Sequence, residues 1–132
     1  MSSTINLQEL IQKLINSCSL SFKRHTISEK ESSIELIFEE ITIKFKIEHN
    51  SFTILNINSH YPYRFNPKED IESVAQKVIT ALKNYLKKFN FENITAYNIT
   101  KGAGKFWERV DFTILFEKNS SGDSIKNGYF SL

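Results

Sequence analysis

Two kinds of side chain in this sequence could move a proton during a reaction at neutral pH. Glu39 and Glu40 form a carboxylate pair at the end of a predicted strand, and His60 follows another predicted strand. A carboxylate or an imidazole at such a place can act as a general base. Glu40 and His60 are therefore the catalytic candidates, although a carboxylate pair at a strand end is also typical of a solvated turn.

We predict no metal site and no nucleotide-binding loop. The residues that could hold a metal are Cys18, His25, His49 and His60. None of them lies at the spacing of a metal-ligand motif. The stretch GAGK at 102–105 is similar to the end of a phosphate-binding loop, but Ile99 stands where that pattern has its first glycine. Phe106 stands where the pattern has serine or threonine, so a turn into a short helix is the simpler interpretation.

The most concentrated aromatic and cationic cluster consists of Tyr61, Tyr63, Arg64 and Phe65. Exposed tyrosine and arginine often anchor contacts between proteins. We predict that this cluster binds a partner protein. The alternative is that Tyr61 and Phe65 close the end of the core while Tyr63 and Arg64 are solvated.

The elements that would position these residues follow from hydrophobic periodicity and capping. Ile41 to Ile47 alternate with polar residues, as in a strand of a sheet with one wet face. Asn66, Pro67 and Glu69 have the order of an N-cap, a first helical residue and a capping box. The predicted elements are a helix over 7–15 capped by Thr4 or Asn6, strands over 34–39, 41–48 and 52–58, a long helix over 67–89, a strand over 94–99, a short helix over 103–110, a strand over 112–116 and a short last strand in the tail 118–130.

We therefore predict a single α+β domain over 1–132, with a mixed, mainly antiparallel sheet flanked by helices. Three of its strands form a meander. The solvent-facing side of the long helix is predicted to carry Lys77, Lys83, Lys87 and Lys88.

Composition restricts the class of protein further. The 132 residues carry 17 Lys and Arg against 15 Asp and Glu, a net charge of +2 without a basic block, which argues against nucleic acid as the main partner. One cysteine cannot form an internal disulfide, which favours a reducing cytoplasm. No stretch has the roughly 18 apolar residues of a membrane span, and no secretory signal is recognised. We expect a cytoplasmic protein with no membrane partner, and a homodimer is among the oligomeric states that remain open.

The element order and the stretch KFWERVDF together resemble the GCN5-related N-acetyltransferase (GNAT) family. In that family a similar aromatic pair, glutamate, basic residue and phenylalanine open the last helix and the strand after it. The matching residues are Phe106, Trp107, Glu108, Arg109 and Phe112, with Ala103 three residues before the pair.

The resemblance implies a cofactor, acetyl-CoA, whose pyrophosphate lies on backbone amides of a glycine-containing turn at the start of the long helix. With Arg64 as the first residue of that motif, Pro67 and Glu69 occupy the glycine positions. Proline offers no amide proton, and the glutamate repels phosphate. The resemblance also implies cofactor contacts from Asn98 and Trp107. Trp107 stands where the family often has a tyrosine that protonates the departing thiolate. An indole N–H can donate a hydrogen bond but does not give up its proton near neutral pH.

These substitutions predict a GNAT-like domain that is not catalytic and acts as a protein-binding or regulatory module, with no cofactor expected. The alternative is an atypical acyl-CoA-dependent N-acetyltransferase. In that case His60, Glu40 or a bound water accepts the proton of the amine, and backbone groups of a splayed strand hold the thioester carbonyl. An unrelated α+β fold is the remaining possibility.

Overall fold

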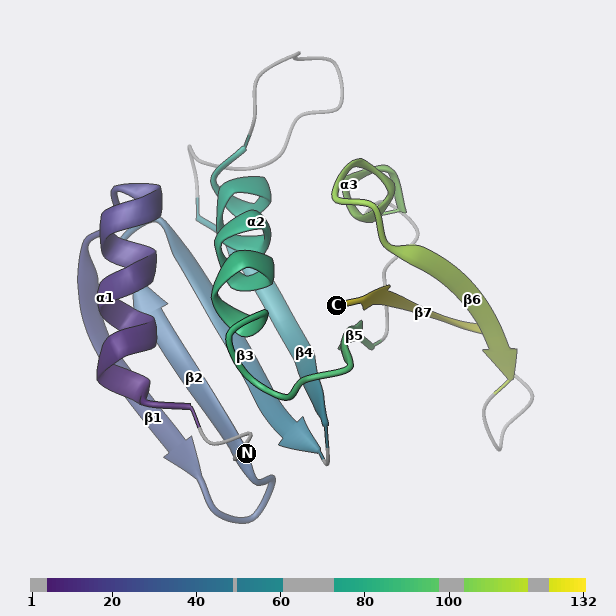
Figure 1. Cartoon of the computed structure of the whole chain (residues 1–132), viewed down its shortest axis with the longest axis horizontal. Helices are drawn as coiled ribbons and strands as arrows, with labels where there is room; N and C mark the ends of the chain where they lie inside the picture. Colours follow the sequence, from purple (N-terminus) through teal and green to yellow (C-terminus); the bar gives the residue numbers. More distant parts are fainter. Residues whose placement is uncertain (1–4, 49, 61–72, 98–103, 119–123) are drawn as a thin grey trace.

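A computed structural model describes residues 5–48, 50–60, 73–97, 104–118 and 124–132 of the chain. Runs of consecutive strands are separated by single helices, as expected for an α+β fold (Figure 1). The elements are α1 (Leu7–Cys18), β1 (Phe22–Ser28), β2 (Ser33–Phe38), β3 (Ile41–Glu48), β4 (Ser51–Ser59), α2 (Val74–Leu86), β5 (Asn93–Ala96), α3 (Gly104–Arg109), β6 (Thr113–Lys118) and β7 (Ser124–Ser131).

The strands form one mixed sheet of seven strands in the order β1-β2-β3-β4-β5-β7-β6. Strands β1 to β4 pair antiparallel in sequence order, and β7 pairs antiparallel with both β5 and β6. Only the pairing of β4 with β5 is parallel among the described strands. A parallel pair needs a crossover, and α2 provides it.

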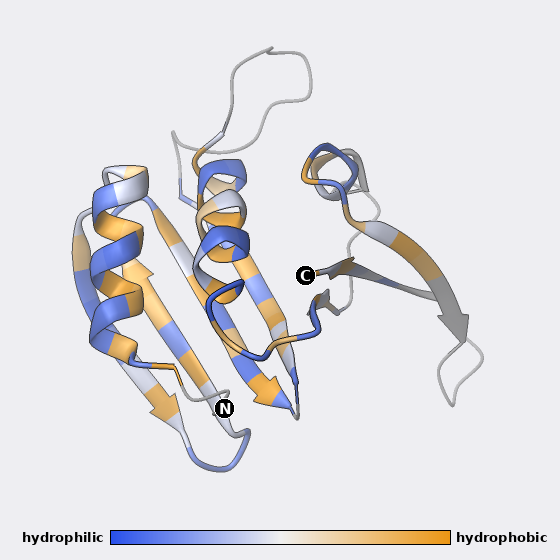
Figure 2. Ribbon diagram, viewed as in Figure 1, coloured by the Kyte–Doolittle hydropathy of each residue, from blue (hydrophilic) through white to orange (hydrophobic). Residues whose placement is uncertain are grey.

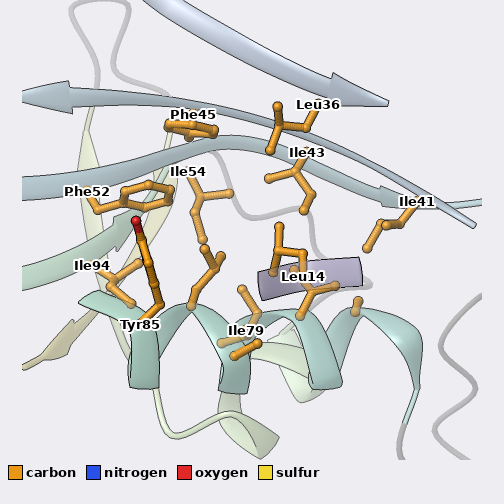
Figure 3. Packing of buried hydrophobic residues seen from close by; sticks show 14 of the residues in the cluster. Leu14, Leu36, Ile41, Ile43, Phe45, Phe52, Ile54, Ile79, Tyr85 and Ile94 are labelled. Atoms are coloured by element: carbon orange, nitrogen blue, oxygen red, sulfur yellow. The ribbon is translucent and has the colours of Figure 1, made fainter. Parts of the chain in front are cut away.

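Helices α1 and α2 lie side by side on the same face of the sheet (Figure 1). The predicted stripe of α1 is confirmed, since Leu10, Ile11 and Leu14 are buried. Asn6 caps this helix, because its side chain accepts a hydrogen bond of 3.1 Å from the amide of Glu9. The side chain of Leu14 meets those of the strands above it (Figure 3).

The alternation predicted for β3 is confirmed from Ile41 to Phe45, whereas Ile47 is 37 % exposed. Ile41, Ile43 and Phe45 are buried on the helix side, whereas Thr42 and Lys44 are half-buried on the other face. Figure 2 shows β2 and β3 changing between hydrophobic and hydrophilic along their length. The rings of Phe45 and Phe52 stack 4.6 Å apart, and Figure 3 shows Tyr85 pointing from α2 toward Phe52. These contacts join the sheet to α2.

Three expectations about the elements were wrong. The antiparallel run has four strands instead of three, because β1 was not predicted. Five of the seven residues of β1 are exposed, so this edge strand lacks a hydrophobic alternation. The long helix begins at Val74, seven residues after Pro67, and Ser73 is its N-cap. Asn66, Pro67 and Glu69 lie outside the described residues. Lys83 is half-buried, unlike the exposed Lys77, Lys87 and Lys88.

No helix in the described part of the chain is both long enough and apolar enough to cross a membrane.

Candidate functional site

The first turn of α2 has backbone amides that bond to no other group in the described part of the chain. Ser73 has extended backbone angles and forms a capping box, in which its hydroxyl accepts from the Gln76 amide at 3.2 Å and its own amide donates to the Gln76 side chain at 2.7 Å. The amides of Val74 and Ala75 have no hydrogen-bond partner among the described residues. The positive end of the helix dipole adds to the attraction of these amides for an anion.

The charge at this turn also suits an anion. The first turn of α2 contains no acidic residue, and Lys77 lies exposed within it. The sequence SVAQ at 73–76 is also a capping-box signature before an apolar run, and it competes with Asn66, Pro67 and Glu69 as a possible start of the helix. The helix begins at Val74, so the register that put Pro67 and Glu69 at its opening is wrong. The steric and electrostatic objections to phosphate at those two residues do not apply to Val74 and Ala75.

Strands β4 and β5 stop pairing before β4 ends. Their register ends with Ile54 opposite Ala96, and the last hydrogen bond runs from the amide of Tyr97 to the carbonyl of Ile54 at 3.2 Å. Strand β4 continues to Ser59, paired with β3. Within the described segments, no strand lies along the other edge of β4 over 55–59. Because α2 connects two parallel strands, its first turn lies at the same end of the sheet as the carboxyl ends of β4 and β5.

His60 lies at this end of the sheet, and both of its ring nitrogens are hydrogen-bonded. Nδ1 lies 2.9 Å from the carbonyl oxygen of Glu39, and Nε2 lies 2.8 Å from the hydroxyl of Thr42. A carbonyl only accepts, so Nδ1 carries a proton and donates it. In the neutral ring Nε2 is then the basic nitrogen and accepts from Thr42. The backbone amide of His60 also donates to the Glu40 carbonyl at 2.8 Å.

The carboxylate of Glu40 already has a structural partner. Its Oε1 accepts a hydrogen bond of 2.9 Å from the amide of Ser21, in the connection between α1 and β1. The structure thus brings Glu40 and His60 together through the backbone, while their side chains bond to different neighbours. Of the two, only His60 presents a basic atom that is bonded to a side chain able to pass on a proton.

Trp107 is 5 % exposed and belongs to an aromatic cluster around α3. Its ring centroid lies 5.0 Å from that of Phe106 and 4.8 Å from that of Phe112. Phe112 in turn lies 6.0 Å from Phe130 of β7. These contacts give Trp107 a packing role, and a contact with a cofactor remains a prediction.

Lys83 joins α2 to the same cluster. Its Nζ donates to the carbonyl of Val110, just after α3, and lies 3.8 Å from the ring centroid of Phe130. Burial lowers the pKa of Lys83, and Lys87 lowers it further, whereas Asp111 raises it. A charge-assisted hydrogen bond contributes about 1.5–3 kcal/mol, which offsets part of the desolvation of the ammonium group. Local periodicity gave no signal for this contact.

The remaining predicted site residues lie outside the described residues. They are Tyr61, Tyr63, Arg64, Phe65 and Asn98. No group of three or more histidine, cysteine or acidic side chains that could hold a metal ion occurs in the described segments.

Comparison with solved structures shows what this arrangement is similar to. Arabidopsis thaliana Naa50, solved with the bisubstrate analogue CoA-Ac-MVNAL, aligns over 97 % of this chain and 95 % of its own, with a TM-score of 0.57 and 16 % identity. Ard1 from Thermoplasma volcanium aligns over 98 % and 82 %, with a TM-score of 0.56 and 13 % identity. The Escherichia coli ribosomal-protein-S18-alanine N-acetyltransferase aligns over 97 % and 90 %, with a TM-score of 0.52 and 11 % identity.

The chain has the GNAT fold. No protein-family model and no curated protein matches it. At these identities the likeness establishes the fold alone, and the GNAT resemblance read from 106–112 is confirmed at that level. The capping rules placed the start of the long helix too early, but the predicted order of the later elements was correct.

Proposed function

We propose that this chain is an acyl-CoA-dependent N-acetyltransferase. The observation that carries the proposal is the pair of amides at the first turn of α2, Val74 and Ala75, which have no hydrogen-bond partner among the described residues and lie at the same end of the sheet as the carboxyl ends of β4 and β5. The GNAT fold supports it, since several of the similar structures are described as acetyltransferases or contain CoA.

The residues at the start of α2 fit a diphosphate. Two adjacent amides can each donate to a phosphate oxygen, and the helix dipole favours the negative charge. The Ser73 hydroxyl is occupied by the Gln76 amide, so the cap keeps the turn in shape without competing for the anion. Acetyl-CoA, when bound, supplies an activated acetyl thioester. Asn98 and Trp107 remain the side chains that the family resemblance predicts to contact it.

His60 is the proposed acceptor of the proton that the attacking amine releases. Its Nδ1–H is held by the Glu39 carbonyl, which leaves Nε2 as the basic atom. The Thr42 hydroxyl, 2.8 Å from Nε2, can pass a proton to it from a bound amine or a water. Glu40 is the weaker candidate because its carboxylate accepts from the Ser21 amide.

The free edge of β4 offers groups that could hold the thioester carbonyl. Strand amides beyond Ile54 on the side away from β3 have no neighbouring strand among the described residues. Fixed amides aimed at a developing oxyanion are an effective form of electrostatic stabilisation. This use of the strand edge is part of the proposal.

The proposal replaces the hypothesis of a non-catalytic module. That hypothesis depended on Pro67 and Glu69 occupying the phosphate-binding turn, and the helix begins later, after Ser73. Its other argument, that Trp107 cannot act as an acid, concerns only the protonation of the leaving thiolate. A water molecule can supply that proton.

Calorimetric titration with acetyl-CoA tests the binding part. Val74→Pro removes one of the two free amides at a helix position that tolerates proline. We expect its dissociation constant to rise about tenfold or more, since one charge-assisted hydrogen bond is lost. Val74→Ala is the matched control, because it removes the branched side chain but keeps the amide. Equal affinities of the proline and alanine variants would exclude this turn as the phosphate site.

Measurement of acetyl transfer to a panel of amines and peptide N-termini tests the chemical part. His60→Gln should lower kcat while leaving the affinity for acetyl-CoA unchanged. Glu40→Gln should have a smaller effect on kcat. If the wild-type chain binds acetyl-CoA but transfers acetyl to none of the amines, the binding-module hypothesis is favoured again.

A further inference from the structure

Lys83 connects two parts of the molecule that otherwise pack on different neighbours. Helix α2 packs mainly against α1 and β4, whereas α3 packs against β6. The side chain of Lys83 leaves α2 and donates to the carbonyl of Val110, at the carboxyl end of α3. The negative end of a helix is the favourable place for an ammonium group.

The aromatic cluster holds the same ammonium group from a second direction. Nζ lies 3.8 Å from the ring centroid of Phe130 and 5.7 Å from that of Phe112. Phe112 packs at 4.8 Å against Trp107, so the contact reaches the aromatic pair of α3 through one ring. Asp111, which follows Val110 in a left-handed conformation at φ 64°, adds an attractive charge.

A surface lysine would not keep this arrangement by chance. Burial of the ammonium group is unfavourable, and the nearby Lys87 adds repulsion. The desolvation of the ammonium group and the repulsion by Lys87 are offset by the Val110 carbonyl, the rings of Phe112 and Phe130, and Asp111. This compensation requires that α3 keeps its place relative to α2. The contact therefore ties the geometry of the two helices to one side chain.

We propose that Lys83 is a positioning residue that fixes α3, and with it Trp107, relative to α2. The structural part stands by itself. The functional part rests on the proposed acetyl transfer, because α2 carries the proposed phosphate-binding amides and α3 carries the predicted cofactor contact. Lys83 touches neither substrate in this scheme and acts only through α3.

The single tryptophan of the chain makes the structural part measurable. Trp107 is 5 % exposed, so a soluble quencher such as acrylamide reaches it poorly. Lys83→Met removes the charge and the donor but keeps a long apolar side chain. We expect a several-fold rise in the quenching constant of Trp107, with the far-ultraviolet circular dichroism of the fold retained. Lys87→Met, at the exposed C-cap position of α2, should leave quenching unchanged. Lys83→Arg should restore values close to wild type.

The same variants test the functional part. Lys83→Met should raise KM for acetyl-CoA several-fold, and Lys83→Arg should reverse most of that rise. Unchanged Trp107 quenching in Lys83→Met would overturn the inference, whatever the kinetics. Changed quenching with an unchanged KM would overturn its functional part alone. If the wild-type chain does not bind acetyl-CoA, the proposed function fails and the quenching result still decides the role of Lys83. Should Lys83→Met not fold, Lys83→Gln, which keeps a donor without the charge, is measured in the same way.

Discussion

Replacing Tyr85 by phenylalanine should raise the free energy of unfolding by about 1 kcal/mol at neutral pH. Tyr85 is 1 % exposed, and its hydroxyl makes no hydrogen bond of acceptable geometry in the described part of the molecule, although burial raises its pKa and the Glu9 carboxylate is close enough to raise it further. Figure 3 shows the oxygen pointing from α2 toward the sheet, beside Phe52. A buried hydroxyl without a partner has lost its hydration without replacement, whereas a phenylalanine ring of the same shape has no such group.

The same hydroxyl makes stability depend on alkaline pH. Burial, and after it the negative charge of Glu9, raise the pKa of Tyr85 from 10.0 to about 12. The unfolded chain therefore loses this proton before the folded chain does. The stabilising contribution is complete below pH 10.0 and is lost as the pH rises through about 12. Between the two values the free energy of unfolding falls by about 1.4 kcal/mol per pH unit, which is roughly 3 kcal/mol in all.

Urea unfolding of the wild type and Tyr85→Phe, followed by circular dichroism at neutral pH and near pH 11, separates the two effects. Other groups titrate in this range, so the difference between the two proteins is the quantity of interest. It should grow by about 1 kcal/mol between the two conditions. Tyr129→Phe is the control, since Tyr129 is 39 % exposed and should give no such growth. A destabilised Tyr85→Phe protein would mean that the hydroxyl has a partner, and the reasoning would fail.

Two further substitutions test the local structure. Ser73→Ala should lower the free energy of unfolding by about 1 kcal/mol, because the capping box at the start of α2 is lost. Ser73→Asp should keep the cap and weaken acetyl-CoA binding through its negative charge. Thermal unfolding measures the first effect and calorimetry the second, and an unchanged melting temperature in Ser73→Ala would contradict the assigned helix start. Thr53→Val should lower the free energy of unfolding by about 1 kcal/mol, because the buried Thr53 hydroxyl accepts from Thr95 at 2.9 Å across β4 and β5. Thr113→Val, at an exposed position, is its control, and equal effects of the two threonine substitutions would exclude a role for that hydrogen bond.

The parts of the fold that could be predicted are those where one helix or strand face is buried along its whole length. The stripe around Leu10 and Leu14 and the alternation from Ile41 to Phe45 each follow from burial on one side only. Strand β1 gave no such signal, since it pairs with β2 on one edge and most of its side chains are in solvent. Its position is set by the register with β2, which local patterns do not contain.

The start of α2 could not be chosen from local rules because two signatures compete. Asn66 with Pro67 and Glu69 satisfies the rules for a helix start, and so does Ser73 with Gln76. The structure assigns the N-cap to Ser73, and the conclusion about phosphate changes with that choice. Because the capping rules are satisfied at both Asn66 and Ser73, these rules alone cannot decide which of the two residues caps the helix.

The environment of Lys83 also depends on contacts distant in sequence. Its neighbours Val110, Phe112 and Phe130 come from other elements, and the pattern of α2 alone favours a solvated lysine. The resemblance identified the aromatic pair at Phe106 and Trp107 correctly as part of the short helix. It could not indicate that a lysine of α2 would pack beside that cluster.

Proton–nitrogen correlation NMR during titration with acetyl-CoA tests the central claim most directly. The account predicts that the amide signals of Val74 and Ala75 move downfield and saturate with the ligand, because these two N–H groups donate to phosphate. The Gln76 amide, already bonded to Ser73, should move much less. Binding that leaves the signals of Val74 and Ala75 in place, or no binding at millimolar acetyl-CoA, would contradict the account.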